Sequence, residues 1–160
     1  MQFKQAEILG GLDKPFIARI MAIGVKSSHE KGKVLFKEGR PAQHFYILIK
    51  GSVRLSVGDK SIYTASHGGE ALGWSALTGR YIYSASATCT EPSALIAFDR
   101  DDLEALMMED PNQAVLFYKN LSLTLGNRLV GVVSHLSEYL SVEDNISYGS
   151  RQVQETMEAV

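Results

Sequence analysis

Cysteine is almost absent from this sequence, which carries only Cys89 among its 160 residues. A single cysteine excludes an internal disulfide and cannot build a structural zinc site by itself. Free cysteines are most often small buried hydrophobes. We therefore expect Cys89 to lie in the interior of a strand and to carry no chemistry.

An excess of positive charge is also missing. The chain has 16 lysines and arginines against 18 aspartates and glutamates, so its formal net charge is −2. Such a chain has no general field that attracts nucleic acid. No apolar run reaches the roughly 18 residues of a membrane span, and the first residues, MQFKQAEILGG, lack the apolar core of a signal peptide. We expect a cytoplasmic protein that neither crosses a membrane nor binds DNA directly.

The chain does have enough length for one hydrophobic core, with a hydrophobic fraction of 45% over 160 residues. This size leaves little room for a second domain. We predict one domain over residues 1–141 and a polar tail over residues 142–160. The tail is too short and too acidic to be a helix-turn-helix DNA-reading domain.

The middle of the sequence consists of short segments rich in aromatic and β-branched residues and separated by glycines. Such segments are typical of strands joined by tight turns. A series of them favours a closed or two-sheet antiparallel structure over a parallel α/β fold. The predicted strands lie in residues 33–39, 44–51, 52–58, 60–66, 83–89 and 93–99.

Helical periodicity occurs on both sides of these strands. Apolar residues recur at helical spacing over residues 6–25, and Asp13 before a proline indicates a helix start there. After the last strand the period is helical again, and Asp101 or Asp102 is the expected N-cap of a short helix.

A long final helix is expected from about Asn112 to Leu140. Its apolar stripe consists of Leu121, Leu125, Leu129, Val132, Leu136 and Leu140. The stripe is longer than the face of one small domain. We therefore predict a homodimer in which two such helices pair in parallel.

The segment from Gly32 to Val57 resembles the first half of a cyclic-nucleotide-binding domain of the catabolite activator and protein kinase regulatory-subunit type. The matching residues are Gly32, Phe36, Glu38, Gly39, Phe45, Tyr46, Gly51 and Val53. The segments GGEALGWSAL and YSASATC resemble the two ends of the family's phosphate-binding cassette, and DRDDLEALMMEDP resembles the segment that leads into its C-terminal helices. The resemblance covers about residues 10–140. It implies a mainly β fold, an antiparallel β-roll (jelly roll) of eight strands with flanking helices, followed by a long C-terminal helix.

The sequence departs from the family's pattern inside the cassette. In the family, a glutamate follows the cassette glycine and accepts from the ribose 2′-hydroxyl, and an arginine nine residues later pairs with the cyclic phosphate. Here Trp74 follows Gly73, and Tyr83 stands nine residues after Trp74, whereas Ser84 and Ala85 keep the small residues of the pattern. Removing one partner of a buried charge pair costs about 2–5 kcal/mol, so we expect cyclic AMP and cyclic GMP to bind poorly.

The candidate ligand-binding residues are Gly73, Trp74, Ser75, Ala76, Leu77, Arg80, Tyr83, Ser84 and Ala85. Backbone N–H groups of residues 75–77 are expected to hold an anion weakly. Arg80 is close enough in sequence to fold back and replace the missing arginine. Trp74 and Tyr83 either form a stacking surface for a planar ligand or fill the pocket as part of the core.

Histidines give no sign of a metal enzyme, although cupin-type enzymes share the β-roll architecture. Such an enzyme needs two or three neighbouring histidines and a carboxylate. The four histidines, His29, His44, His67 and His135, are scattered without an H-x-H pair, as surface or loop residues are. We therefore expect neither an enzyme nor a metal site.

These observations together predict a stand-alone regulatory domain that senses a small ligand in signal transduction. Its output is then a change in helix geometry or in dimer contacts, received by a separate effector protein. No cofactor is specified, and a nucleotide or a small planar anion fits the pattern. Two alternatives stay open: a constitutive protein-interaction module with a non-functional pocket, and a truncated relative of activator-type transcription regulators.

Overall fold

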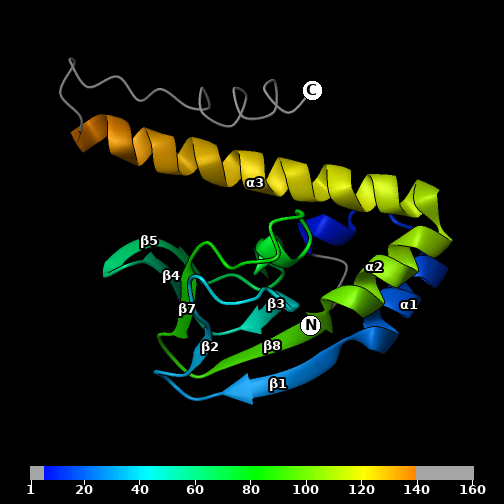
Figure 1. Cartoon of the computed structure of the whole chain (residues 1–160), viewed down its shortest axis with the longest axis horizontal. Helices are drawn as coiled ribbons and strands as arrows, with labels where there is room; N and C mark the ends of the chain where they lie inside the picture. Colours follow the sequence, from blue (N-terminus) through cyan, green and yellow to red (C-terminus); the bar gives the residue numbers. More distant parts are fainter. Residues whose placement is uncertain (1–5, 140–160) are drawn as a thin grey trace. The chain divides into compact units, whose positions relative to one another are not determined.

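Two four-stranded antiparallel sheets form the centre of the fold in the computed structural model, which describes residues 6–139 (Figure 1). One sheet has the order β1-β8-β3-β6 and the other has the order β2-β7-β4-β5. The strands are β1 (Val25–His29), β2 (Val34–Phe36), β3 (His44–Lys50), β4 (Val53–Val57), β5 (Lys60–Ala65), β6 (Ala71–Leu72), β7 (Ser86–Cys89) and β8 (Ser93–Asp99). This arrangement confirms the predicted antiparallel β-roll.

β3 is central in its sheet, between β8 and β6, and it is buried on both faces because its side chains pack into two clusters. Phe45 and Ile47 belong to one hydrophobic cluster, whereas Tyr46 and Leu48 belong to another. Alternate side chains of a strand point to opposite faces of its sheet. The continuous apolar run of β3 therefore supplies two different cores.

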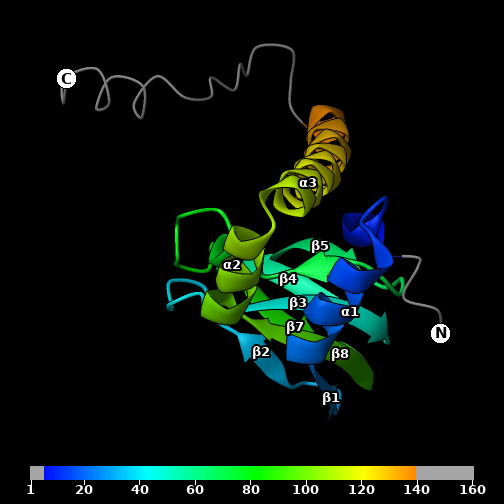
Figure 2. The same cartoon turned by 90° about the vertical axis from the view of Figure 1, so that its right-hand side faces the viewer.

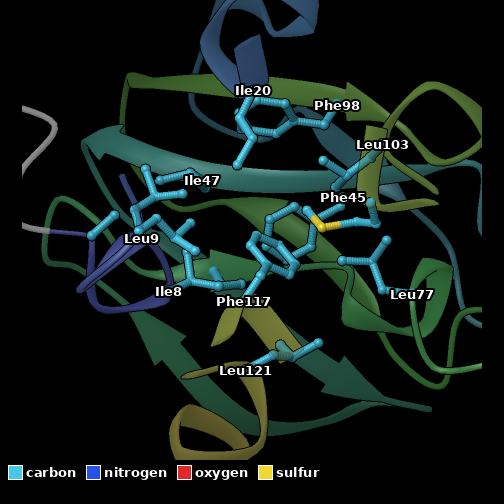
Figure 3. Close-up of a cluster of buried hydrophobic side chains, with 14 of the residues drawn as sticks. Ile8, Leu9, Ile20, Phe45, Ile47, Leu77, Phe98, Leu103, Phe117 and Leu121 are labelled. Atoms are coloured by element: carbon cyan, nitrogen blue, oxygen red, sulfur yellow. The ribbon is translucent and has the colours of Figure 1, made fainter. Parts of the chain in front are cut away.

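The first of these cores, which we call the helix-covered cluster, joins β3 and β8 to the helices. The helices are the 3-10 helix η2 (Glu7–Leu9), α1 (Lys14–Ile23), α2 (Arg100–Glu109) and α3 (Pro111–Tyr139). Phe117 of α3 packs edge to face on Phe45, with ring centres 6.4 Å apart (Figure 3). Figure 2 shows α1 and α2 next to each other in front of the strands.

The second core, which we call the roll interior, lies between the two sheets. It contains Leu55 and Ala87 from one sheet and Leu72 and Leu95 from the other, all at most 2% exposed. Cys89 is a buried free thiol in this cluster, as predicted.

Capping aspartates determine where α1 and α2 begin. Asp13 caps α1 by accepting a hydrogen bond of 2.7 Å from the backbone N–H of Phe16, as the sequence predicted. The predicted N-cap of α2, Asp101 or Asp102, is wrong. Asp99 is the N-cap, and its carboxylate accepts from the N–H groups of both of those residues. Aspartates are also favoured in the first turn of a helix, so the acidic signal did not identify the cap.

α3 begins at Pro111 and ends at Tyr139, within one residue of the predicted bounds at each end. Its predicted apolar stripe divides: Leu121 is buried and Leu125 packs against the helix-covered cluster, whereas Leu129 and Leu136 are 57% and 38% exposed. Leu140 lies outside the described residues.

The chain divides by packing into two units, residues 1–128 and 129–160. The domain boundary that we expect at residue 141 stays a prediction, and the tail over residues 142–160 lies outside the described part of the chain. Within residues 6–139, no helix combines the length and the hydrophobicity needed to cross a membrane.

Candidate functional site

The candidate loop follows β6 and turns sharply at Gly73, which has a φ of +71°. A Cβ atom at this position would lie 2.8 Å from the backbone oxygen of His44. Both the left-handed backbone and the close approach to β3 therefore require glycine. The turn leads into the 3-10 helix η3 (Trp74–Ala76).

Tyr83 is buried in the roll interior, with an exposed fraction of 5%. Its ring stacks on Phe36 with ring centres 4.0 Å apart. Its hydroxyl donates to the backbone oxygen of His44 at 2.8 Å and accepts from the N–H of the same residue at 3.1 Å. Burial raises the pKa of Tyr83, so its side chain is neutral. The loop therefore holds no charge at this position.

The backbone of η3 uses the N–H groups that we expected to hold an anion. The N–H of Ala76 donates to the oxygen of Gly73 at 3.1 Å, and the N–H of Leu77 donates to the oxygen of Trp74 at 2.9 Å. Two of the three N–H groups from residues 75–77 are therefore already paired within the loop.

The cavity at the loop has a volume of about 10 Å³, roughly the space that one water molecule needs. It is lined by Phe36, Leu55, Gly73, Trp74, Ser75, Tyr83, Ser84 and Ala85. The structure thus brings together six of the nine predicted residues, and the space between them is too small for a nucleotide. Arg80 is exposed and does not line the cavity.

Trp74 lies at the meeting point of the two cores. It is partly buried and packs against both the helix-covered cluster and the roll interior. The guanidinium carbon of Arg128, on α3, lies 5.2 Å from the centre of its ring and 4.7 Å from the ring centre of Tyr63 on β5. Both distances are within the range of cation–π contacts.

Glu70 completes this arrangement, with its carboxylate 3.8 Å from the guanidinium of Arg128. Burial alone would raise the pKa of Glu70. Hydrogen bonds from the Tyr63 hydroxyl and from the N–H groups of His67 and Ser66, together with Arg128, hold the pKa below its usual value. The carboxylate is therefore a fixed negative charge beside the two rings.

Sequence reasoning missed Tyr63, Glu70 and Arg128. An arginine in a predicted amphipathic helix is read as a solvated residue, because arginines are mostly exposed. Arg128 is instead 12% exposed in its side chain. No spacing in the sequence relates these three residues, since they lie on β5, before β6 and on α3.

A wider groove of about 380 Å³ lies away from the loop, along β1, β3 and β8. Its polar lining includes His29, His44, Lys33 and Asp99. His29 and His44 are thus partly buried strand residues and not the surface or loop residues that we expected. Within the described residues, no three His, Cys, Asp or Glu side chains gather as metal ligands would.

Comparison with known proteins gives one family. The family model of the cyclic nucleotide-binding domain matches residues 26–110. A Rhodopseudomonas palustris protein, named as a candidate potassium channel protein, is 31% identical over 100 residues, which are 61% of this chain and 24% of that protein. This chain therefore spans about a quarter of that relative's length.

Solved structures show the same fold. A cyclic nucleotide-binding domain from Methylobacillus flagellatus has a TM-score of 0.76 at 16% identity, over 88% of this chain and 85% of that one. The catabolite activator protein of Thermus thermophilus has a TM-score of 0.67 at 25% identity, over 83% of this chain and 62% of that one. Related domains thus occur in regulators and in a channel-like protein, and the family is mainly regulatory. With its two-sheet β-roll and a family match over residues 26–110, this chain belongs to the cyclic nucleotide-binding domain family.

Proposed function

We propose that this chain is a regulatory domain that responds to a small ligand other than tightly bound cyclic AMP or cyclic GMP. The observation that carries this proposal is Tyr83, a buried neutral ring at the position where the resemblance places the phosphate-binding arginine. The position after Gly73 likewise carries Trp74 in place of a carboxylate.

Tyr83 cannot make the contact that an arginine at this position would make with a phosphate. A charge-assisted, bidentate arginine–phosphate contact is among the strong polar interactions. Its loss costs about 2–5 kcal/mol, which converts a micromolar binder into one with a dissociation constant between about 30 μM and several millimolar. The small volume of the cavity, about 10 Å³, adds to this, because a nucleotide has to displace side chains first.

Calorimetry with cyclic AMP and cyclic GMP tests the proposal. The wild type is expected to bind poorly, and the double variant Trp74→Glu with Tyr83→Arg is expected to gain measurable binding, because it returns the ribose acceptor and the phosphate counter-charge. Each single variant serves as a control and should gain less. Tight binding by the wild type would contradict the proposal. Arg80 would then be the replacement, so Arg80→Ala should abolish binding and Tyr83→Phe should not.

A second candidate function is a constitutive protein-interaction module, which the small volume of the cavity at the loop favours. A thermal-shift screen with nucleotides and small aromatic metabolites separates the two, because a ligand that binds only the folded state raises the melting temperature. A sensor gives a concentration-dependent shift with some member of the screen, whereas a constitutive module gives none.

We further propose that the domain forms a homodimer through α3. Large apolar side chains are exposed along its later part: Leu129, Val130, Val133 and Leu136. The double variant Leu129→Asp with Leu136→Asp should be monomeric in sedimentation at tens of micromolar. Leu123→Asp, on an exposed residue outside the stripe, is the matched control. A wild type that is already monomeric would refute the dimer.

The proposed module is cytoplasmic, is not an enzyme, and acts through an effector protein without binding DNA itself. Its net charge of −2 supports the last point, because sequence-specific DNA binding depends on neutralising phosphates with lysine and arginine. A sequence-selective gel shift by this chain alone would contradict it.

A further inference from the structure

The guanidinium of Arg128 lies in a cage made by Tyr63, Glu70 and Trp74. The two ring centres are 4.7 and 5.2 Å from its central carbon, and the nearest carboxylate oxygen is 3.8 Å from its Nη2. Two aromatic rings and a carboxylate are the groups that proteins use to bind organic cations. The cage residues come from β5, from the residue before β6 and from η3, and Arg128 comes from α3.

Arg128 fits this cage incompletely. Its Nη1 is buried and donates to no acceptor among the described residues. A buried donor without a partner is destabilising, and such groups are rare in folded proteins. The cage therefore offers fewer acceptors than a guanidinium has N–H groups.

A quaternary ammonium group matches the cage better than a guanidinium, because it carries a full positive charge and has no N–H group to satisfy. An anion does not fit, because the Glu70 carboxylate is fixed there and remains charged. This differs from the planar anion that the sequence suggested.

We propose that Tyr63, Glu70 and Trp74 form a binding site for the quaternary ammonium head group of a small ligand, and that Arg128 occupies this site when the ligand is absent. The inference rests on the proposed function, because Trp74 belongs to both. Binding of the head group displaces Arg128 and so removes the contacts that this residue of α3 makes with Tyr63 on β5 and Trp74 on η3. This gives the domain a way to convert ligand binding into a change at α3.

The experiment uses tetramethylammonium chloride as the probe and the fluorescence of Trp74 as the readout, since Trp74 is the only tryptophan of the chain. Arg128→Met removes the guanidinium from the cage and keeps the apolar stem of the side chain. This variant should show a saturable fluorescence change with a midpoint of about 1–50 mM. Sodium chloride at equal concentration should give none. Far-UV circular dichroism and a thermal melt establish that the variant is folded.

Two matched comparisons assign the response to the cage. The wild type should need at least about tenfold more tetramethylammonium, because tethered Arg128 competes at a high effective concentration. Arg100→Met removes a guanidinium that lies over a different ring, 4.6 Å from the centre of Tyr81, and should behave as the wild type does. Adding Glu70→Gln to Arg128→Met should weaken the response.

The inference is overturned if folded Arg128→Met gives no saturable response beyond that of sodium chloride. Equal midpoints in the wild type and Arg128→Met would overturn the role of Arg128 as the occupant. If Arg128→Met does not fold, Arg128→Lys replaces it, and its midpoint should fall below that of the wild type, since an ammonium does not stack on aromatic rings as a planar guanidinium does. These results are independent of the cyclic-nucleotide calorimetry, so failure of the cage and failure of the proposed function give different patterns.

Discussion

The helix-covered cluster and the roll interior share β3 and differ in the side chains that fill them. The helix-covered cluster is packed by rings without polar atoms, such as Phe45, Phe98 and Phe117. The roll interior contains Tyr46 and Tyr83, which bring hydroxyl groups into a buried space. A phenylalanine ring needs only shape, whereas a buried tyrosine also needs hydrogen-bond partners.

This difference gives the roll interior a polar constraint that the buried phenylalanines of the helix-covered cluster do not have. The hydroxyl of Tyr83 is fixed by the backbone of His44, and the same orientation puts its ring into the cavity at the loop. A substitution in the helix-covered cluster is expected to change stability alone. A substitution in the roll interior is expected to have a smaller effect on the free energy of unfolding and a larger effect on the conformation of the candidate loop.

The largest expected effect comes from the helix-covered cluster. Phe117→Ala should lower the free energy of unfolding by about 3–5 kcal/mol, because it leaves a cavity beside Phe45. Val115→Ala, at a position 70% exposed on the same helix, is the control and should change it by less than about 0.5 kcal/mol. Urea unfolding at pH 7 measures both. A loss below about 1 kcal/mol for Phe117→Ala would show that this cluster repacks easily.

A smaller effect is expected in the roll interior. Tyr83→Phe keeps the ring and removes the hydroxyl, so the N–H and the backbone oxygen of His44 each lose a partner. The expected loss is about 1–3 kcal/mol in the free energy of unfolding. Tyr81→Phe is the matched control, because the Tyr81 hydroxyl makes only an exposed contact with Glu104. Equal stability of Tyr83→Phe and wild type would remove the distinction between the two cores.

The smallest effect appears only at alkaline pH. Burial, with the nearby Tyr83, raises the pKa of Tyr46 from 10.0 to about 12. Between these values the unfolded chain loses the proton and the folded chain keeps it, so the stability falls as the pH rises from 10 towards 12. Urea midpoints between about pH 8 and pH 11 should fall less steeply for Tyr46→Phe than for the wild type. Some slope should remain, because the pKa of Tyr83 is also raised. An unchanged slope would mean that Tyr46 does not contribute.

The strands that could be predicted have their own run of aromatic and β-branched residues, and they include β5, which is mostly exposed. β3, β4 and β8 carry the alternating or continuous apolar pattern that burial imposes. β1 was missed because its sequence, VKSSH, has no buried residue. It exists because it pairs with β8 from Val25↔Ala97 to His29↔Ser93. A strand held by a partner's backbone leaves little trace in its own residues.

The sequence predicted where the candidate loop lies, but it did not predict whether the space inside the loop is open or filled by side chains. The sequence placed Gly73, Trp74 and Tyr83 together, and they do line one cavity. It left open whether the two aromatic rings form a surface or fill the space. The volume of about 10 Å³ shows that they fill it in this structure. That outcome depends on Phe36 and on the backbone of His44, which contact Tyr83 from β2 and β3.

The sequence by itself determined a series of antiparallel strands, the long helix and the absence of charge at positions 74 and 83, because hydrophobic period, turn glycines and side-chain charge are local properties. The β-roll itself was implied by the resemblance to the family. Only the tertiary structure decided that Asp99 caps α2, that side chains fill the space inside the loop, and that Arg128 lies between Tyr63 and Trp74 beside Glu70. The cap depends on which of three neighbouring aspartates reaches the free N–H groups of α2, and the other two features are contacts between segments that are distant in the chain. Such contacts form only when the whole chain packs, so the sequence pattern around any one residue does not contain them.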